Sequence, residues 1–162
     1  MGLSKAEALF LKNNARDFPF LQDGNFNITS PPTVRYNCIA WASGDDKRHC
    51  WPDSPYWPGG GPRSTTLAAF TMMFGTLGYV EADSGAVETG FEKIAIYIKG
   101  NQVTHAARQL TSGLWTSKLG KHVDISHTLK AIEGGSYGVV AKFFKRPTLT
   151  VTTPTVSQAK GA

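Results

Sequence analysis

One cysteine of this sequence has the surroundings that nucleophilic chemistry requires. The segment R-Y-N-C-I-A-W-A places Cys38 where a helix is expected to begin, and Ser43-Gly44 is expected to end that helix. Main-chain N–H groups in the first turn of a helix are unpaired, and with the helix dipole they favour a thiolate. A thiolate attacks carbonyl carbons, and the same N–H groups can hold an oxyanion. The other interpretation is a small buried apolar residue, as free cysteine often is.

A nucleophilic thiol needs a base, and the chain has four histidines: His49, His105, His122 and His127. The first lies in a loop rich in proline and glycine, and the last two flank an expected helix start, where we predict surface positions. His105 lies within the expected strand V-T-H-A-A-R-Q-L. It is therefore the preferred base, and the alternative is a core histidine hydrogen-bonded to the main chain.

The expected strand pairing gives His105 a particular face. A two-residue turn at Gly100-Asn101 sets His105 opposite Ile96, and the T-S-G turn sets it opposite Leu119. Val103, Ala107 and Trp115 are expected on the same apolar side. The helix that begins at Cys38 is a layer that can cover this side, so we expect the two residues to meet.

Further residues complete the expected site. Asp124 is the only acidic residue between 93 and 132 and could orient the second ring nitrogen of His105, although it could equally cap a helix. Ser117, diagonal to His105 on the same expected face, and Gln109 are the other polar candidates for this role. The candidates for substrate binding are Asn37, Trp41, Gln109 and Ser117. We expect neither a metal nor a cofactor, because the chain lacks C-x-x-C, EF-hand and phosphate-loop spacings.

The elements that must position these residues change in character along the chain. We expect a helix over residues 4–15 with Ser4 and Glu7 as a capping box, a loop over 17–33, and a helix that Ser64 caps and Gly78 ends. Strands are expected over 91–99, 103–110, 114–119 and 137–145, and a short helix over 124–133. This order predicts an α+β fold in which N-terminal helices pack on a C-terminal antiparallel β-meander. Residues 1–147 would form a single domain and 148–162 a mobile tail.

Composition excludes several classes of protein. The chain has 162 residues and a formal net charge of +5, with no apolar run long enough for a membrane span and no recognisable signal peptide. Residues 1–92 contain seven basic and ten acidic residues, whereas 93–146 contain nine basic and two acidic ones. A basic half-surface could steer an anionic partner, although charged strand faces are usually only solvated. The mild net charge alone does not call for nucleic acid.

Two segments resemble papain-like thiol hydrolases of the NlpC and CHAP types. The hairpin E-K-I-A-I-Y-I-K-G-N-Q-V-T-H-A resembles H-V-G-I-Y-I-G-x-G-x-x-I-H-A, and R-Y-N-C resembles Y-D-C-S-G. The main base of that pattern falls on Lys93, and His105 falls on the place of its third, orienting residue. Two alternatives follow from this difference. Either the catalytic roles have moved, so that His105 is the base, or the hydrolase fold persists without activity. Y-N-C-I-A-W-A, T-H-A-A-R-Q and W-T-S-K-L-G also resemble an uncharacterised bacterial family across nearly the whole chain.

The resemblance implies a papain-like cysteine hydrolase that acts on amide bonds, as a peptidase, a peptidoglycan amidase or a side-chain deamidase. Its substrate would be a protein, a peptide or peptidoglycan. The chain would be cytoplasmic or secreted without a classical signal peptide, and as a toxin or effector it would have a secretion or immunity partner. The alternatives are a catalytically inactive fold that serves as a binding module and, third, a nucleic-acid-binding protein.

Overall fold

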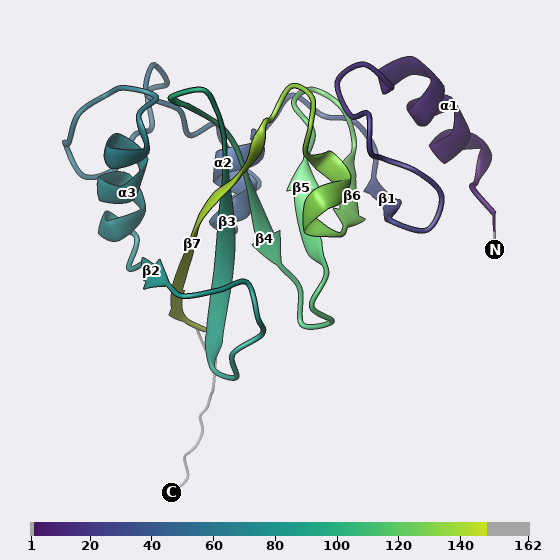
Figure 1. Cartoon of the computed structure of the whole chain (residues 1–162). Helices are drawn as coiled ribbons and strands as arrows, with labels where there is room; N and C mark the ends of the chain where they lie inside the picture. Colours follow the sequence, from purple (N-terminus) through teal and green to yellow (C-terminus); the bar gives the residue numbers. More distant parts are fainter. Residues whose placement is uncertain (1, 149–162) are drawn as a thin grey trace, which may run out of the picture.

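The computed structural model describes residues 2–148, and Figure 1 shows their arrangement. The helices are α1 (Lys5–Asn14), α2 (Cys38–Ala42), α3 (Leu67–Thr76) and a short 3-10 helix (Leu129–Ile132). The strands are β1 (Phe26–Ser30), β2 (Val80–Ala82), β3 (Phe91–Lys99), β4 (Gln102–Gln109), β5 (Trp115–Lys118), β6 (Asp124–His127) and β7 (Val139–Pro147). This confirms the α+β class. Apart from residue 148, the expected mobile tail lies outside the described residues.

The strands form one antiparallel sheet in the order β1-β6-β5-β4-β3-β7-β2. Three expectations from the sequence are wrong here. Residues 26–30, expected as loop, form β1, because Phe26 is buried and the segment pairs with β6. Residues 124–127, expected as the start of a helix, form β6, in which Ile125 and His127 share one face. Helix α3 is capped by Thr66 and not by Ser64.

Helices cover both faces of the sheet. One hydrophobic cluster joins α2 and α3 to Ile94, Ile96 and Ala106 of the central strands. The other joins α1 and the 3-10 helix to the alternate residues of the same strands, among them Tyr97 and Ala107. In Figure 1, α2 accordingly lies behind β3 and β4. Alternation along β4 therefore decides which cluster each of its side chains enters.

A bulge in β4 changes that alternation before His105. Next to the turn, Ile98 pairs with Val103, but the following pair is Tyr97 with His105, so Thr104 is the extra residue. The Thr104 hydroxyl donates to the carbonyl of Tyr137 at 2.6 Å, which holds the bulge. The expected pairing of His105 with Ile96 is therefore wrong, and Val103 enters the α2 cluster instead of sharing a face with His105.

Basic residues of the second half of the chain are paired with acidic residues of the first half. Three ion pairs join β7 to residues 81–92, which extend from β2 into β3: Lys142–Glu81, Lys145–Glu88 and Arg146–Glu92. Lys93 is buried, donates to the carbonyl of Ser84 at 2.9 Å and also pairs with Glu88. The charge excess of residues 93–146 is thus partly balanced within the molecule.

Glu7 ties α1 to the sheet, and its loss is expected to destabilise the fold. One carboxylate oxygen accepts the main-chain N–H of Ser4, which completes the expected capping box, and the other accepts that of Ile28 in β1 at 2.9 Å. Replacing Glu7 with alanine should lower the free energy of unfolding by about 1–3 kcal/mol, measured in urea at pH 7. The exposed Glu81→Ala should change it by less than about 1 kcal/mol, and an equal loss in both variants would contradict the assignment.

The same contacts predict a pH dependence. The main-chain hydrogen bonds from Ser4 and Ile28 lower the pKa of Glu7 below its ordinary value. The folded chain therefore favours the carboxylate more than the unfolded chain does. This stabilisation is complete above the unfolded pKa and is lost as the pH falls through the folded pKa. The stability difference between the wild type and Glu7→Gln should accordingly shrink in acid.

Candidate active site

Cys38 is the first residue of α2, as the sequence predicts, and Asn37 fixes its position. The side-chain oxygen of Asn37 accepts the main-chain N–H groups of Ala40 at 3.1 Å and of Cys50 at 3.0 Å. Its amide nitrogen donates to the carbonyl of Cys50 at 2.8 Å. The Asn37 amide therefore joins the start of α2 to the loop that returns beside it. These contacts give Asn37 a structural role instead of the expected role in substrate binding.

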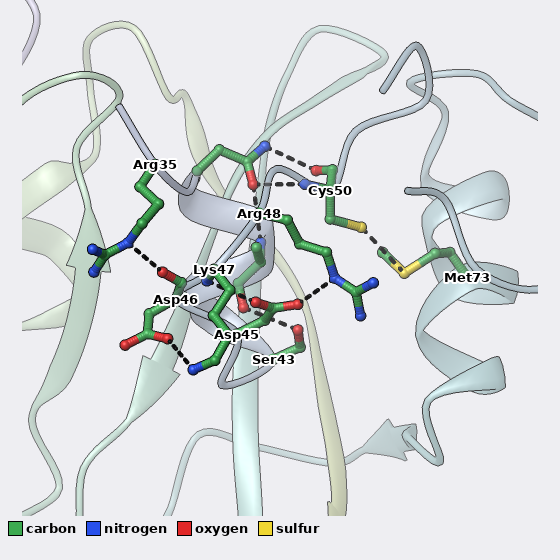
Figure 2. Close-up of polar contacts among 10 residues, drawn as sticks. Arg35, Ser43, Asp45, Asp46, Lys47, Arg48, Cys50 and Met73 are labelled. Atoms are coloured by element: carbon green, nitrogen blue, oxygen red, sulfur yellow. Dashed lines mark hydrogen bonds and ion pairs between the residues drawn. The ribbon is translucent and has the colours of Figure 1, made fainter. Parts of the chain in front are cut away.

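The loop after α2 is held by its own charges. Figure 2 shows the Asp45 carboxylate accepting from Arg48 and the carbonyl of Asp46 accepting from Arg35. At the end of this loop the Cys50 sulfur points to the Met73 sulfur of α3, 4.0 Å away (Figure 2). Both cysteines are free and buried. Cys50 thus packs against an apolar thioether, and both cysteines belong to the hydrophobic cluster of α2 and α3.

Main-chain N–H groups surround the Cys38 thiol. Burial raises the pKa of the Cys38 thiol to about 11, and it outweighs the main-chain N–H groups of Ala106, Ile39 and Cys38 itself, which favour the thiolate. The expectation that the helix start yields a thiolate is therefore wrong for the resting protein. Because α2 has only five residues, its dipole is small, and the thiol stays protonated at neutral pH.

The contact with Ala106 places the thiol at the level of the sheet. Main-chain N–H groups of a strand point sideways, toward the place of the neighbouring strand. Strands β4 and β5 pair only at Arg108↔Thr116 and Gln109↔Trp115, in the register that the sequence predicts. The expected partnership of His105 with Leu119 does not form. Residues 103–107 of β4 are thus without a partner in β5.

His105 lies on the face of the sheet opposite to α2. Its fully buried ring stacks on Tyr137 with centroids 4.0 Å apart and meets the edge of Tyr97. The expectation that the α2 layer covers this ring is wrong, because the bulge at Thr104 turns it to the other face. Burial lowers the pKa of His105 well below 6.5, so the imidazole is neutral. Its Nδ1 atom has no hydrogen-bond partner, and hence none with Cys38.

A chain of hydrogen bonds begins at the other ring nitrogen of His105. Its Nε2 atom is 2.8 Å from the hydroxyl oxygen of Ser117 in β5, which is 2.7 Å from Nε2 of His127 in β6. Nδ1 of His127 is 2.7 Å from the carbonyl oxygen of Thr128. The His105 ring is therefore joined from β4 to β5 through Ser117. This contact agrees with the expectation that Ser117 lies on the face of His105 and can orient its ring.

The remaining predicted site residues are engaged elsewhere. The buried carboxylate of Asp124 accepts hydrogen bonds from the hydroxyls of Ser30 and Tyr36, both at 2.5 Å, so it does not orient His105. The Trp41 indole donates to Thr116 of β5 at 3.1 Å. The Gln109 amide donates to the carbonyl of Gly85 at 2.6 Å. All three contacts hold elements of the fold together.

Sequence reasoning missed two residues of the site, His127 and Tyr137. His127 was expected at the surface and is instead almost fully buried, with 1% of its area exposed. Alternation in D-I-S-H, which places Ile125 and His127 on one face, is a signal that could have found it. Tyr137 follows two glycines and carries no such signal. It reaches His105 only through the tertiary fold.

Comparison with known proteins assigns the chain to a family. Residues 27–145 match the family model described as Domain of unknown function (DUF7689). The chain belongs to the DUF7689 family. The match extends from β1 into β7 and includes Cys38, His105, Ser117 and His127. Neither the curated proteins nor the solved structures give a match.

Residues 2–148 form neither a metal-binding cluster nor a membrane-spanning helix. Within this part of the chain, no cluster of three or more histidine, cysteine or acidic side chains is arranged to hold a metal ion. None of its helices has the length and apolar character needed to cross a bilayer.

Proposed function

We propose that this member of the DUF7689 family is a papain-like cysteine hydrolase that cleaves amide bonds, with Cys38 as nucleophile and His105 as base. One observation carries the proposal. The N–H of Ala106 in β4, the residue after His105, acts on the Cys38 thiol and lowers its pKa, and β5 does not pair with β4 at this residue. The ring of His105 itself is buried, and its Nδ1 has no hydrogen-bond partner. A base must have a free lone pair close to the proton that it removes.

The protonation states favour a neutral pair in the resting enzyme. The thiol pKa of about 11 and the lowered pKa of His105 keep both groups uncharged at pH 7. As Cys38 attacks the carbonyl carbon, Nδ1 of His105 takes the thiol proton, and the carbonyl oxygen becomes an oxyanion. The imidazolium then gives its proton to the leaving amine, and a thioester remains for water to hydrolyse. Catalytic contacts often tighten only when substrate binds.

The N–H groups around the thiol supply the second part of the mechanism. Those of Cys38 and Ile39 belong to the start of α2, and that of Ala106 belongs to β4. They are preorganised donors in a site from which water is excluded, so they stabilise negative charge as it develops. The substrate class is an amide of a protein, a peptide or peptidoglycan, and the chain would act in the cytoplasm or as a secreted effector.

Acylation of Cys38 tests this proposal. We expect p-nitrophenyl acetate to transfer one acetyl group to Cys38 with release of p-nitrophenolate, measured by absorbance and by mass spectrometry of the digested protein. Cys38→Ala should remove the modification, whereas Cys50→Ala, which changes the other buried thiol, should retain it. Peptide p-nitroanilides extend the assay to amides. Acetylation confined to lysines, or no reaction above that of Cys38→Ala, would refute the nucleophile.

A second candidate function is a binding module without catalytic activity. The absence of a hydrogen bond between Cys38 and His105 and the raised pKa of the thiol favour it. This candidate predicts that the wild type and Cys38→Ala react equally with the ester. The same assay therefore separates the two functions.

A further inference from the structure

The hydroxyl of Ser117 lies between two buried imidazole rings. It is 2.8 Å from Nε2 of His105 and 2.7 Å from Nε2 of His127. The rings come from β4 and β6, with Ser117 on β5 between them. Their exposed fractions are 0% and 1%. A hydroxyl has one proton to donate and lone pairs to accept, so it can join two rings only if one donates to it and the other accepts from it.

The carbonyl of Thr128 fixes the direction of this chain. A carbonyl oxygen only accepts, so Nδ1 of His127 carries the proton of that hydrogen bond. A neutral imidazole has one N–H, and Nε2 of His127 must therefore accept the proton of the Ser117 hydroxyl. The Ser117 oxygen then accepts from Nε2–H of His105. Nδ1 of His105 is left without a proton.

We infer that Ser117 and His127 are positioning residues that hold His105 in the tautomer protonated at Nε2, which leaves the Nδ1 lone pair available as a base. The catalytic role of the free Nδ1 lone pair rests on the proposed function. The assignment of the two tautomers does not depend on it. The two histidines carry their protons on different nitrogens, His105 on Nε2 and His127 on Nδ1. A base whose proton lies on the wrong nitrogen cannot accept one there.

Burial supports the neutral state that the chain of hydrogen bonds needs. Burial lowers the pKa of His127 to about 4 and that of His105 well below 6.5. Both rings are therefore uncharged at pH 7. Stacking on Tyr137, with ring planes 9° apart, fixes the plane of the His105 ring. Hydrogen bond and stacking together leave this ring one orientation.

Nuclear magnetic resonance of the wild-type ring nitrogens tests the inference directly. At pH 7 we expect His105 to show a protonated Nε2 and a bare Nδ1, and His127 the reverse. Single replacements of the histidines assign the signals, and the exposed His122 serves as a reference. A protonated Nδ1 on His105, or a charged ring on either residue, would overturn the inference. This outcome does not depend on whether the protein acylates.

Replacement of Ser117 tests its positioning role. Ser117→Ala should give His105 a mixture of tautomers and slow acylation of Cys38 by about tenfold or more. Ser117→Thr keeps a hydroxyl and should restore both readouts. Unchanged His105 signals in folded Ser117→Ala would overturn the role of Ser117. If the wild type shows the expected tautomers but no acylation, the proposed function fails while the assignment of the tautomers stands.

Discussion

Alanine in place of His105 is expected to slow the acylation of Cys38 by about 10²–10⁴-fold, the range that a general base contributes. The thiol of the variant would have to ionise without help, and its pKa is raised to about 11. The rate should therefore rise about tenfold with each pH unit below that value. The wild-type rate should change little across neutral pH, because the lowered pKa of His105 keeps the base unprotonated.

A matched variant separates this effect from general damage to the fold. His122 is exposed, and its ring contacts the edge of Phe10. His122→Ala should acylate at the wild-type rate. Circular dichroism should show that His105→Ala retains its sheet. If both variants acylate equally and with the same pH profile, His105 is not the base.

Replacing Asp124 with alanine is expected to cost about 3–5 kcal/mol of unfolding free energy, because it removes one member of a buried group of charges. The carboxylate accepts the hydroxyls of Ser30 in β1 and Tyr36 before α2. It also stabilises the charge of the fully buried Lys118, whose pKa is lowered by burial and raised by Asp124. The change would leave the hydroxyls of Ser30 and Tyr36 and a buried ammonium group without this partner.

Urea unfolding measures this loss, with two further variants for comparison. Asp53 is an exposed loop residue, so Asp53→Ala should stay within about 0.5 kcal/mol of the wild type. Adding Lys118→Met to Asp124→Ala should recover part of the loss, since the ammonium group is then absent. A loss below about 1 kcal/mol for Asp124→Ala, or no recovery in the double variant, would contradict a coupled buried group.

Local patterns predicted the parts of the fold that depend on neighbouring residues. The capping box of α1, the start of α2 at Cys38 and the hairpin of β3 and β4 all follow from signals within a few residues. The bulge does not, because Thr104 is held by Tyr137, which is 33 residues away. Likewise β1 forms through its pairing with β6, about a hundred residues later in the chain.

The candidate site also has features that local patterns predict and features that depend on contacts between distant segments. Cys38 and His105 could be selected by residue type and by their place in predicted elements. The protonation state of Cys38 could not be predicted from the sequence. Burial raises the pKa of its thiol by more than the N–H groups at the helix start lower it. The hydrogen bonds that link His105, Ser117 and His127 depend on β4, β5 and β6 lying side by side. Because the sequence predicts a helix for residues 124–127, it does not predict this link. As the only acidic residue between 93 and 132, Asp124 is the natural candidate to orient His105, but its actual partners are hydroxyls of distant segments that the sequence does not connect to it.

The single extra residue at Thr104 makes strand register a determinant of the chemistry. If the same residues paired without the bulge, the register set by the Gly100-Asn101 turn would put the imidazole on the side of α2, away from Tyr137 and Ser117. Every functional side chain would remain in the sequence, and yet the histidine would be separated from its hydrogen-bond chain. Deletion of Thr104 would instead remove the bulge and keep His105 opposite Tyr97. Related sequences should therefore be compared first by whether the spacing between this turn and the histidine requires a bulge, and only then by residue identity.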